Sequence, residues 1–283
     1  MPASSFLVEI QLKYNQLTKT EKKVADFVVR NVSQVLFMSI SDLSEACGVA
    51  DASVHRFCRT MGLKGYQEFK MKLSLSLTPE EEEREKFSGY KVDSLQYTLD
   101  QVLESHISAL KETRMILGVE ELERTVCMME EAERIYFFGV GDSILTAMEA
   151  RNKFLRIMPK VSCIEDTHMQ AMTASMAGPK DLIFFVSYSG ATKDNIYVAK
   201  IARRSGAGIV CITRFVKSPL TSYADTVLLC GSNEGPLEGG SMGAKLSQLY
   251  IIDILFHEYY RRNMVVSKEN NHKTSKAVVD KLY

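Results

Sequence analysis

Residues 181–195, DLIFFVSYSGATKDN, decide the fold of the second half of the chain. An apolar run, Leu182 to Val186, breaks into a loop of three aliphatic hydroxyls and one glycine, and a segment with helical periodicity follows. A buried strand that enters a helix through such a loop is typical of α/β proteins. Free backbone N–H groups and the positive end of the helix dipole would point into the loop. The stretch therefore predicts a parallel sheet with an anion site at the end of one strand.

The same alternation extends over residues 135–262. The predicted strands are 135–138, 161–164, 182–186, 209–213 and 226–229. The predicted helices are 94–117, 119–131, 143–157, 168–176, 192–205 and 240–260. Short apolar strands separated by helices predict a flavodoxin-like, doubly wound, five-stranded parallel sheet that is covered on both faces. The polar tail, residues 263–283, carries no clear structural signal.

Two loops at the carboxyl ends of predicted strands form the candidate ligand site. The first and third strands are neighbours in this fold, so the loop 139–143 would face the loop 187–192. Hydroxyls and backbone N–H groups bind phosphate oxygens and sugar hydroxyls, so we expect a small phosphorylated, sugar-like ligand. The candidate ligand residues are Gly141, Ser143, Ser187, Ser189, Gly190 and Thr192, together with Glu238 in the glycine-rich loop before the last long helix.

Other chemistries have weaker support in the sequence. The loop 139–143 lacks the third glycine of a dinucleotide fingerprint, so no cofactor is expected. His168 and Glu238 are candidate acid–base groups, but a structural histidine and a surface-loop glutamate are simpler readings, and we assign no catalytic residue. Met169, Met172 and Met176 share one helix face and are expected in the core. No His/Cys/Asp cluster has zinc-ligand spacing, so no metal site is expected.

Residues 39–61, SISDLSEACGVADASVHRFCRTM, predict a helix-turn-helix within a first block of short helices, residues 1–77. Ser41 is the expected N-cap of the first helix, and Gly48 supplies the left-handed residue of the turn. The buried face of the second helix is expected to be Val54, Phe57, Cys58 and Met61, which follow helical spacing. The acidic segment 78–93 then predicts a linker, and residues 94–283 form the second domain.

The outer face of the second helix carries the DNA-binding hypothesis. Ala52, Arg56 and Arg59 would face outward with His55 at the edge, and arginine can read guanine in the major groove. Lys64, Lys70 and Lys72 would extend the basic side. Residues 1–77 contain ten Lys and Arg against seven Asp and Glu, a net charge of +3. The alternative is a helical bundle with a solvated charged face or a protein-binding role.

Composition gives broader limits. Lys plus Arg (35) equals Asp plus Glu (35), so any attraction to nucleic acid must be local. The six cysteines are scattered among apolar neighbours without a CxxC pair, which favours reduced, buried thiols. Because no secretory signal and no apolar stretch of membrane-spanning length is present, we expect a cytoplasmic protein without membrane contact.

Several motifs in both blocks resemble the RpiR-type bacterial transcriptional regulators, in which a helix-turn-helix precedes a sugar isomerase (SIS) domain. The N-terminal motifs are Leu17-Thr18-x-x-Glu21, Ser53-Val54-x-Arg56-Phe57 and Gly62-Leu63-x-Gly65-Tyr66-x-Glu68-Phe69-Lys70. The C-terminal motifs are Gly139-x-Gly141-x-Ser143, Ser187-x-Ser189-Gly190-x-Thr192 and Ser218-Pro219-Leu220 followed by Ala224-Asp225. The family usually has Ser at the position of Ala50, so Asp51 is expected to cap the recognition helix here instead.

The resemblance implies a function and its residues. It implies a regulator that binds double-stranded operator DNA and responds to a phosphorylated sugar or sugar acid. It also implies a homodimer or homotetramer held through the SIS domains. Carried over, the phosphate would lie at Ser143, Ser187, Ser189 and Thr192, and the DNA surface would contain Ser53, His55, Arg56, Arg59 and Lys64. The alternatives are a sugar-phosphate isomerase or lyase with a helical appendage, and a ligand-gated protein-interaction module.

Overall fold

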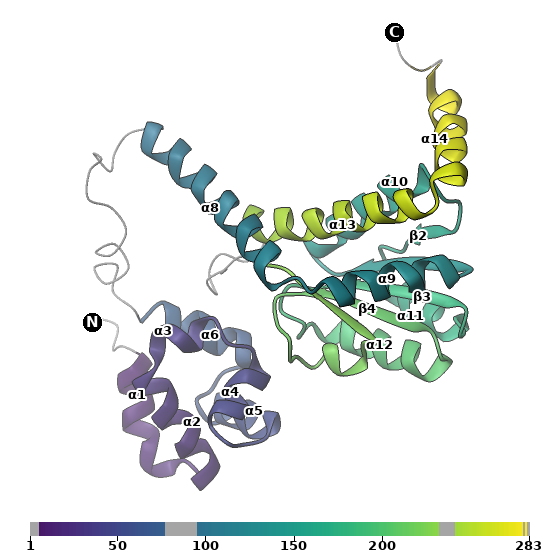
Figure 1. Cartoon of the computed structure of the whole chain (residues 1–283). Helices are drawn as coiled ribbons and strands as arrows, with labels where there is room; N and C mark the ends of the chain where they lie inside the picture. Colours follow the sequence, from purple (N-terminus) through teal and green to yellow (C-terminus); the bar gives the residue numbers. More distant parts are fainter. Residues whose placement is uncertain (1–5, 77–94, 232–240, 280, 282–283) are drawn as a thin grey trace. The chain divides into compact units, whose positions relative to one another are not determined.

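The computed structural model describes residues 6–76, 95–231, 241–279 and 281. These residues form two compact units with separate hydrophobic cores, a helical domain and an α/β domain (Figure 1). The predicted linker, residues 78–93, is outside the described residues. Among the helices that the structure describes, none has the length and apolar character needed to span a membrane.

The helical domain is built around an aromatic centre. It contains α1 (Phe6–Lys13), the 3-10 turn Tyr14–Gln16, α2 (Lys19–Arg30), α3 (Val32–Leu36), α4 (Ile40–Ala46), α5 (Asp51–Thr60) and α6 (Tyr66–Ser74). The ring of Phe69 lies 5.8 Å, centroid to centroid, from each of Phe6, Phe57 and Tyr66. These contacts join α1, α5 and α6, so the recognition-helix candidate is fixed to the rest of the domain by its apolar face.

The α/β domain contains the predicted five-stranded parallel sheet. Its strands are β1 (Arg134–Gly139), β2 (Val161–Cys163), β3 (Asp181–Val186), β4 (Gly208–Thr213) and β5 (Thr226–Leu229). Their order in the sheet is β2-β1-β3-β4-β5, and every neighbouring pair is parallel. This confirms the flavodoxin-like prediction. The central strand β3 is buried along its whole length because helices cover both faces of the sheet.

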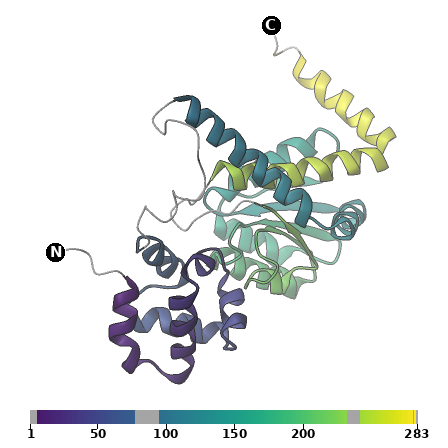
Figure 2. The same cartoon turned by 60° about the vertical axis from the view of Figure 1, so that its left-hand side comes forward.

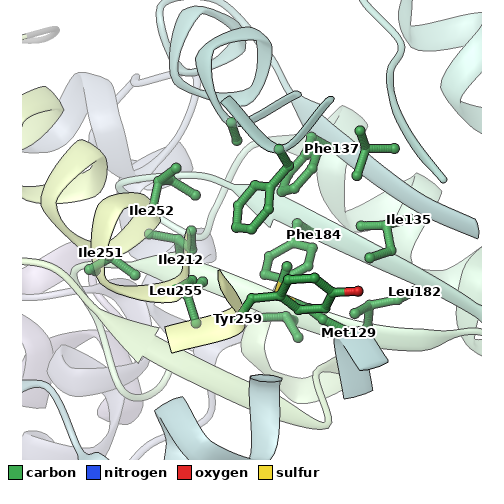
Figure 3. Packing of buried hydrophobic residues seen from close by; sticks show 14 of the residues in the cluster. Met129, Ile135, Phe137, Leu182, Phe184, Ile212, Ile251, Ile252, Leu255 and Tyr259 are labelled. Carbon is green, nitrogen blue, oxygen red and sulfur yellow. The ribbon is translucent and has the colours of Figure 1, made fainter. Parts of the chain in front are cut away.

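Helices lie on the two faces as the doubly wound fold requires. The helices of this part of the chain are α8 (Leu95–Ile116), α9 (Val119–Glu131), α10 (Ser143–Leu155), α11 (Thr167–Met176), α12 (Lys193–Ser205) and α13 (Met242–Arg262). The boundary between the two compact units falls within α8, after Glu104. Helices α9, α10 and α13 share one core with the sheet. In this core the ring centroids of Phe137 and Phe184 lie 4.9 Å apart, and the two rings face Ile252 and Leu255 of α13 (Figure 3). Helices α11 and α12 pack on the other face.

The polar tail is a helix, contrary to its weak signal in the sequence. Helix α14 (Met264–Val279) follows α13 directly and projects from its end in both views (Figures 1 and 2). Only Ser267 of α14 is buried. Hydrogen bonds to the end of α10 hold it, including one from Asn270 Nδ2 to the Ile157 carbonyl oxygen at 2.9 Å. Because these anchors lie over a hundred residues earlier in the chain, periodicity within the tail does not reveal them.

Candidate functional sites

The predicted helix-turn-helix is α4, the turn after it, and α5. Gly48 in the turn has a φ of +61°, the left-handed conformation expected for it. Val54, Phe57, Cys58 and Met61 are all buried, which confirms the predicted inner face. The outer face carries Ala52, His55, Arg56 and Arg59, all exposed.

The helix caps differ from the prediction. Ser39, not Ser41, is the N-cap of α4, and it forms a capping box with Asp42. Ala50 is at the N-cap position of α5 without a side-chain hydrogen bond, so Asp51 does not cap that helix. Instead, Asp51 accepts hydrogen bonds from Ser41 (2.9 Å) and Ser44. This carboxylate therefore ties α4 to the first turn of α5 and helps to set the angle between them.

The candidate DNA residues separate into an exposed group and a supporting one. Arg56, Arg59, His55 and Lys64 are exposed. A Cβ atom on Gly65 would lie 3.5 Å from the His55 ring, so the loop that carries Lys64 borders α5. Ser53 is buried, and its hydroxyl accepts a hydrogen bond from an Arg56 Nη at 3.1 Å. The structure thus presents Ser53 as a partner that orients Arg56 rather than as a surface residue.

Two lysines that were expected to extend the basic side do not do so. Lys70 is buried and donates to the Met38 carbonyl oxygen at 3.3 Å, with its Nζ 5.5 Å from the centroid of the Tyr66 ring. Lys72 forms an ion pair with Glu9 at 2.6 Å. Lys70 lies on the packed side of α6, and Lys72 is half-exposed but neutralised by Glu9. The candidate basic surface is therefore limited to the outer face of α5 and the adjoining loop.

Glu21 is a polar anchor behind α5 that the sequence motif only hinted at. It completes a capping box with Thr18 and accepts a hydrogen bond from the Thr60 hydroxyl at 2.7 Å. Burial opposes its ionisation, but the hydrogen bonds from Thr18 and Thr60 outweigh burial and hold its pKa below the usual value. Glu21 therefore stays ionised and joins the start of α2 to the end of the recognition helix.

Burial of Lys70 makes the stability of the protein depend on pH. Desolvation lowers the pKa of Lys70 to about 8, although Asp42 partly opposes this shift. Because the folded state then binds fewer protons than the unfolded state above pH 8, the contribution of Lys70 to stability should rise between pH 8 and about 10.5. The free energy of unfolding of the wild type relative to Lys70→Met should increase by roughly 2 kcal/mol between pH 7 and pH 10, measured by urea unfolding.

Comparison with the variant isolates this effect from other groups. Burial raises the pKa of Cys47 to about 11 and that of Cys58 to about 12, which lowers stability at alkaline pH in both proteins alike. A stability difference that stays constant from pH 7 to pH 10 would contradict a buried, titrating Lys70.

In the α/β domain, the register of the sheet brings the two candidate loops together. Gly139, the last residue of β1, pairs with Val186, the last residue of β3. The loops 139–143 and 187–192 therefore leave the same edge of the sheet from adjacent strands. Each loop leads into a helix, α10 after the first and α12 after the second. Two helix N-termini with unbonded N–H groups thus begin beside each other, an arrangement that favours a bound anion.

The first loop is shaped by its glycines. A Cβ atom on Gly139 would come within 2.8 Å of the Ser143 carbonyl oxygen, so only glycine lets α10 begin this close to β1. Gly141 has a φ of +62°. Ser143 is the first residue of α10 and is partly exposed, and its hydroxyl has no hydrogen-bond partner within the described residues. Asp142 beside it forms an ion pair with Lys245 at 2.9 Å.

The second loop is held by its backbone and leaves hydroxyls available. The Ser187 N–H donates to the Ile212 carbonyl oxygen at 3.0 Å, and the Ser187 carbonyl oxygen accepts from the Gly190 N–H at 3.3 Å. The Ser189 hydroxyl accepts from the Ala191 N–H at 3.2 Å. Thr192 is the N-cap of α12 but its side chain makes no capping bond. Across the described part of the chain, the side-chain hydroxyls of Ser187 and Thr192 have no hydrogen-bond partner.

Gly190 controls the shape of this loop. Its φ is +58°, and a Cβ atom there would lie 2.1 Å from the Ser218 Oγ and 2.7 Å from the Ser218 Cβ. Its carbonyl oxygen accepts from the Leu220 N–H at 3.0 Å, so the 218–220 segment packs directly on the loop. The Ser218-Pro219-Leu220 motif therefore helps to shape the hydroxyl loop.

Replacing Gly190 by alanine should therefore distort the loop. We expect the unfolding free energy to fall by roughly 2 kcal/mol, because alanine would be strained in the left-handed conformation and would clash with Ser218. This loss corresponds to a drop of about 4–8 °C in Tm. Gly178→Ala is the matched control, since a Cβ atom on Gly178 would meet no other atom within 4 Å and its φ lies outside the left-handed region. Equal Tm values for the two variants in thermal unfolding would contradict the close contact at Gly190.

Two candidate acid–base residues were predicted besides the loop residues. His168 is exposed in the first turn of α11, at the end of β2. Glu238 lies outside the described residues. Gly231, which follows β5, donates its N–H to the Thr113 hydroxyl of α8 at 2.8 Å and so anchors the chain just before that segment. In the described part of the chain, no group of three or more His, Cys, Asp or Glu side chains could hold a metal ion.

Two buried polar residues near these loops were not predicted from the sequence. Gln170 is buried and its Nε2 donates to the carbonyl oxygens of Gly139 (3.0 Å) and Ile164 (2.7 Å). It therefore joins the ends of β1 and β2 at the edge where the first loop begins. Asn195 is buried in the first turn of α12. The available signal was helical spacing, since Asn195 is in register with Val198 and Ala202 of α12, and Gln170 with Ala174 of α11.

Comparisons with known proteins agree with this architecture. The helix-turn-helix domain model of the rpiR family matches residues 4–80, and the SIS domain model matches residues 128–258. An uncharacterized HTH-type transcriptional regulator of Haemophilus influenzae is 33% identical over 98% of both chains. The HTH-type transcriptional regulator HexR of Pseudomonas aeruginosa is 32% identical over 89% of this chain and 87% of its own.

A solved structure is similar over the whole chain. The Vibrio vulnificus NanR protein, complexed with ManNAc-6P, matches with a TM-score of 0.87 and 30% identity over 98% of this chain and 100% of that chain. The chain therefore belongs to the RpiR family of helix-turn-helix transcriptional regulators with a SIS domain, and it is a transcriptional regulator rather than an enzyme.

Proposed function

We propose that this regulator senses a phosphorylated sugar or sugar acid at the paired loops 139–143 and 187–192, and that the bound ligand changes the affinity of α5 for operator DNA. The observation that carries the proposal is the pairing of Gly139 with Val186, which sets the two loops and two helix N-termini side by side. Hydroxyls of Ser143, Ser187 and Thr192 that lack partners in the described residues supply additional donors. The ManNAc-6P bound by NanR is an example of this ligand class.

The proposed ligand residues have distinct roles. The N–H groups of the two helix starts and the hydroxyls of Ser143, Ser187, Ser189 and Thr192 would bind the phosphate. Gly141 and Gly190 would allow the backbone to come close to it. Glu238 would contact the sugar part. On the DNA side, His55, Arg56, Arg59 and Lys64 would contact the duplex, and Ser53 would orient Arg56. The regulator would act as a homodimer or homotetramer joined through its α/β domains.

Coupling between the two sites requires only unequal binding. A ligand that binds the DNA-competent and DNA-incompetent forms with different affinities shifts their populations and thereby changes the operator affinity. By linkage, operator DNA changes the ligand affinity by the same factor. No contact between the ligand and α5 is needed.

A thermal-shift screen tests the sensing proposal. Purified protein is mixed with sugar phosphates, amino-sugar phosphates including ManNAc-6P, and sugar-acid phosphates, with the unphosphorylated compounds and inorganic phosphate as controls. A ligand that binds only the folded state raises the Tm by mass action. At a concentration 100 times its Kd, it adds about 2.7 kcal/mol to the free energy of unfolding. We expect a shift with one phosphorylated compound and none with its unphosphorylated counterpart. Equal shifts for both would contradict a phosphate site.

A further inference from the structure

Three methionines predicted to lie in the core are on the surface. Met169, Met172 and Met176 of α11 are 50%, 61% and 80% exposed. Their spacing of three and four residues places them on one face of the helix, as predicted, but that face points away from the sheet. Ala174 and Gln170 form the buried face instead. The prediction failed because helical spacing shows that residues share a face without showing which face is inside.

A basic stripe lies on the neighbouring helix. Helices α11 and α12 lie side by side on the same face of the sheet (Figure 1), so their outer faces look the same way. The outer face of α12 carries Lys193, Tyr197, Lys200 and Arg204, all exposed and spaced by three or four residues. Within the described residues, none of these three cations forms an ion pair. Arg203, one position away, is by contrast paired with Asp225 at 2.6 Å.

The two stripes are carried by helices that pack against each other on one face of the sheet, so we treat them as one candidate surface. Helix α11 contains no Asp, Glu, Lys or Arg, so its outer face is uncharged except for His168. Exposed methionines form an adaptable apolar surface that suits a helical partner. Three unpaired cations along one side favour a partner with negative charge. We use the name Met–Lys surface for the exposed residues of both stripes, which are Met169, Met172, Met176, Lys193, Tyr197, Lys200 and Arg204.

We propose that the Met–Lys surface binds an acidic amphipathic helix of another protein. The apolar residues of that helix would lie against the methionines, and its carboxylates would face Lys200 and Arg204. This goes beyond the proposed sensing function, since the surface is separate from α5 and does not require a sugar phosphate. Duplex DNA fits less well because the methionine stripe offers nothing to phosphates. A membrane fits less well because interfacial helices use leucine and bulky aromatics on their apolar face.

Fluorescence anisotropy with the full chain tests the proposal. The probe is a fluorescein-labelled amphipathic peptide of about 18 residues, long enough to form a helix, with leucines along one face and glutamates on the other. A second peptide carries lysine in place of every glutamate. We expect the glutamate peptide to bind and the lysine peptide not to bind. Met172→Glu should weaken binding at least about tenfold, and so should the double variant Lys200→Glu with Arg204→Glu. The loss in the double variant should shrink more at high salt than the loss in Met172→Glu, which also removes an apolar contact.

Matched variants elsewhere provide the controls. Met115 of α8 is 85% exposed, and Lys276 of α14 is exposed, so Met115→Glu and Lys276→Glu introduce the same changes away from the surface. Both should bind the glutamate peptide like the wild type, and circular dichroism should show equal helix content in all variants. Equal binding of the two peptides, or wild-type affinity of Met172→Glu, would overturn the proposal.

Two further outcomes would assign the surface to a different occupant. Sedimentation velocity is measured on the wild type and Met172→Glu without peptide. The first outcome is that the wild type self-associates, that Met172→Glu abolishes this self-association, and that the glutamate peptide does not compete with it. That outcome would identify a second copy of the chain as the occupant and overturn the proposal. Displacement of the peptide by duplex DNA that depends on Lys200 and Arg204 would overturn it in favour of nucleic acid.

Discussion

Replacing both Arg56 and Arg59 by alanine should reduce the affinity for specific duplex DNA by about 100-fold or more. Both guanidinium groups lie on the exposed face of α5, opposite the buried Val54 and Phe57. Each can form bidentate hydrogen bonds to a guanine or a charge-assisted bond to a phosphate. The measurement is fluorescence anisotropy with duplexes that the wild type selects from a random-sequence library, at fixed salt.

Two controls separate recognition from general loss of charge. Lys72→Met removes a cation of the same domain that is already paired with Glu9, and it should change DNA affinity little. The arginine double variant should still show the wild-type thermal shift with its sugar phosphate, because the ligand loops belong to the other domain. Operator affinity unchanged in the double variant would remove α5 as the recognition helix.

Replacing Ser189 and Thr192 by alanine should abolish the thermal shift with the sugar phosphate. Hydrogen bonds to a charged group contribute about 1.5–3 kcal/mol each, so the loss of two corresponds to roughly 100-fold or more in Kd. The unliganded protein should lose little stability, since Thr192 makes no capping bond and Ser189 contributes one bond within the loop. Thermal shift and isothermal titration calorimetry measure the two effects.

A hydroxyl outside the loops is the matched control. Ser222 donates to the Pro219 carbonyl oxygen and is exposed, so Ser222→Ala should bind the ligand like the wild type. A double Ser189/Thr192 variant that keeps wild-type affinity would place the sensor elsewhere on the α/β domain.

The sheet was predictable from the sequence because local signals and the global fold agree. Each strand is a short apolar run, and strands alternate with helices, which leaves few topologies for a parallel sheet. The place of Gly190 in a loop was also predictable from the sequence, although its contact with Ser218 was not. That contact joins segments 28 residues apart, so only the folded chain shows why a side chain cannot be accommodated there.

Features that depend on packing direction were not predictable. The methionines of α11 follow helical periodicity, which shows a shared face but does not distinguish the inner from the outer face without neighbours. Lys70 is buried because its long side chain reaches the Met38 carbonyl in the link between α3 and α4. The predicted N-caps were wrong for a similar reason. Ser39 and Ser41 are both favourable N-cap residues, and Asp51 accepts a hydrogen bond from Ser41 of α4 instead of capping α5.

The most direct test of the account is the DNA affinity of the full chain with and without the sugar phosphate that gives the largest thermal shift. The wild type should change its operator affinity by about 5–150-fold on ligand addition, and the Ser189/Thr192 double alanine variant should not respond. The unphosphorylated sugar should have no effect on either protein. Identical operator affinity of the wild type with and without saturating ligand would contradict the claim that the paired loops control DNA binding.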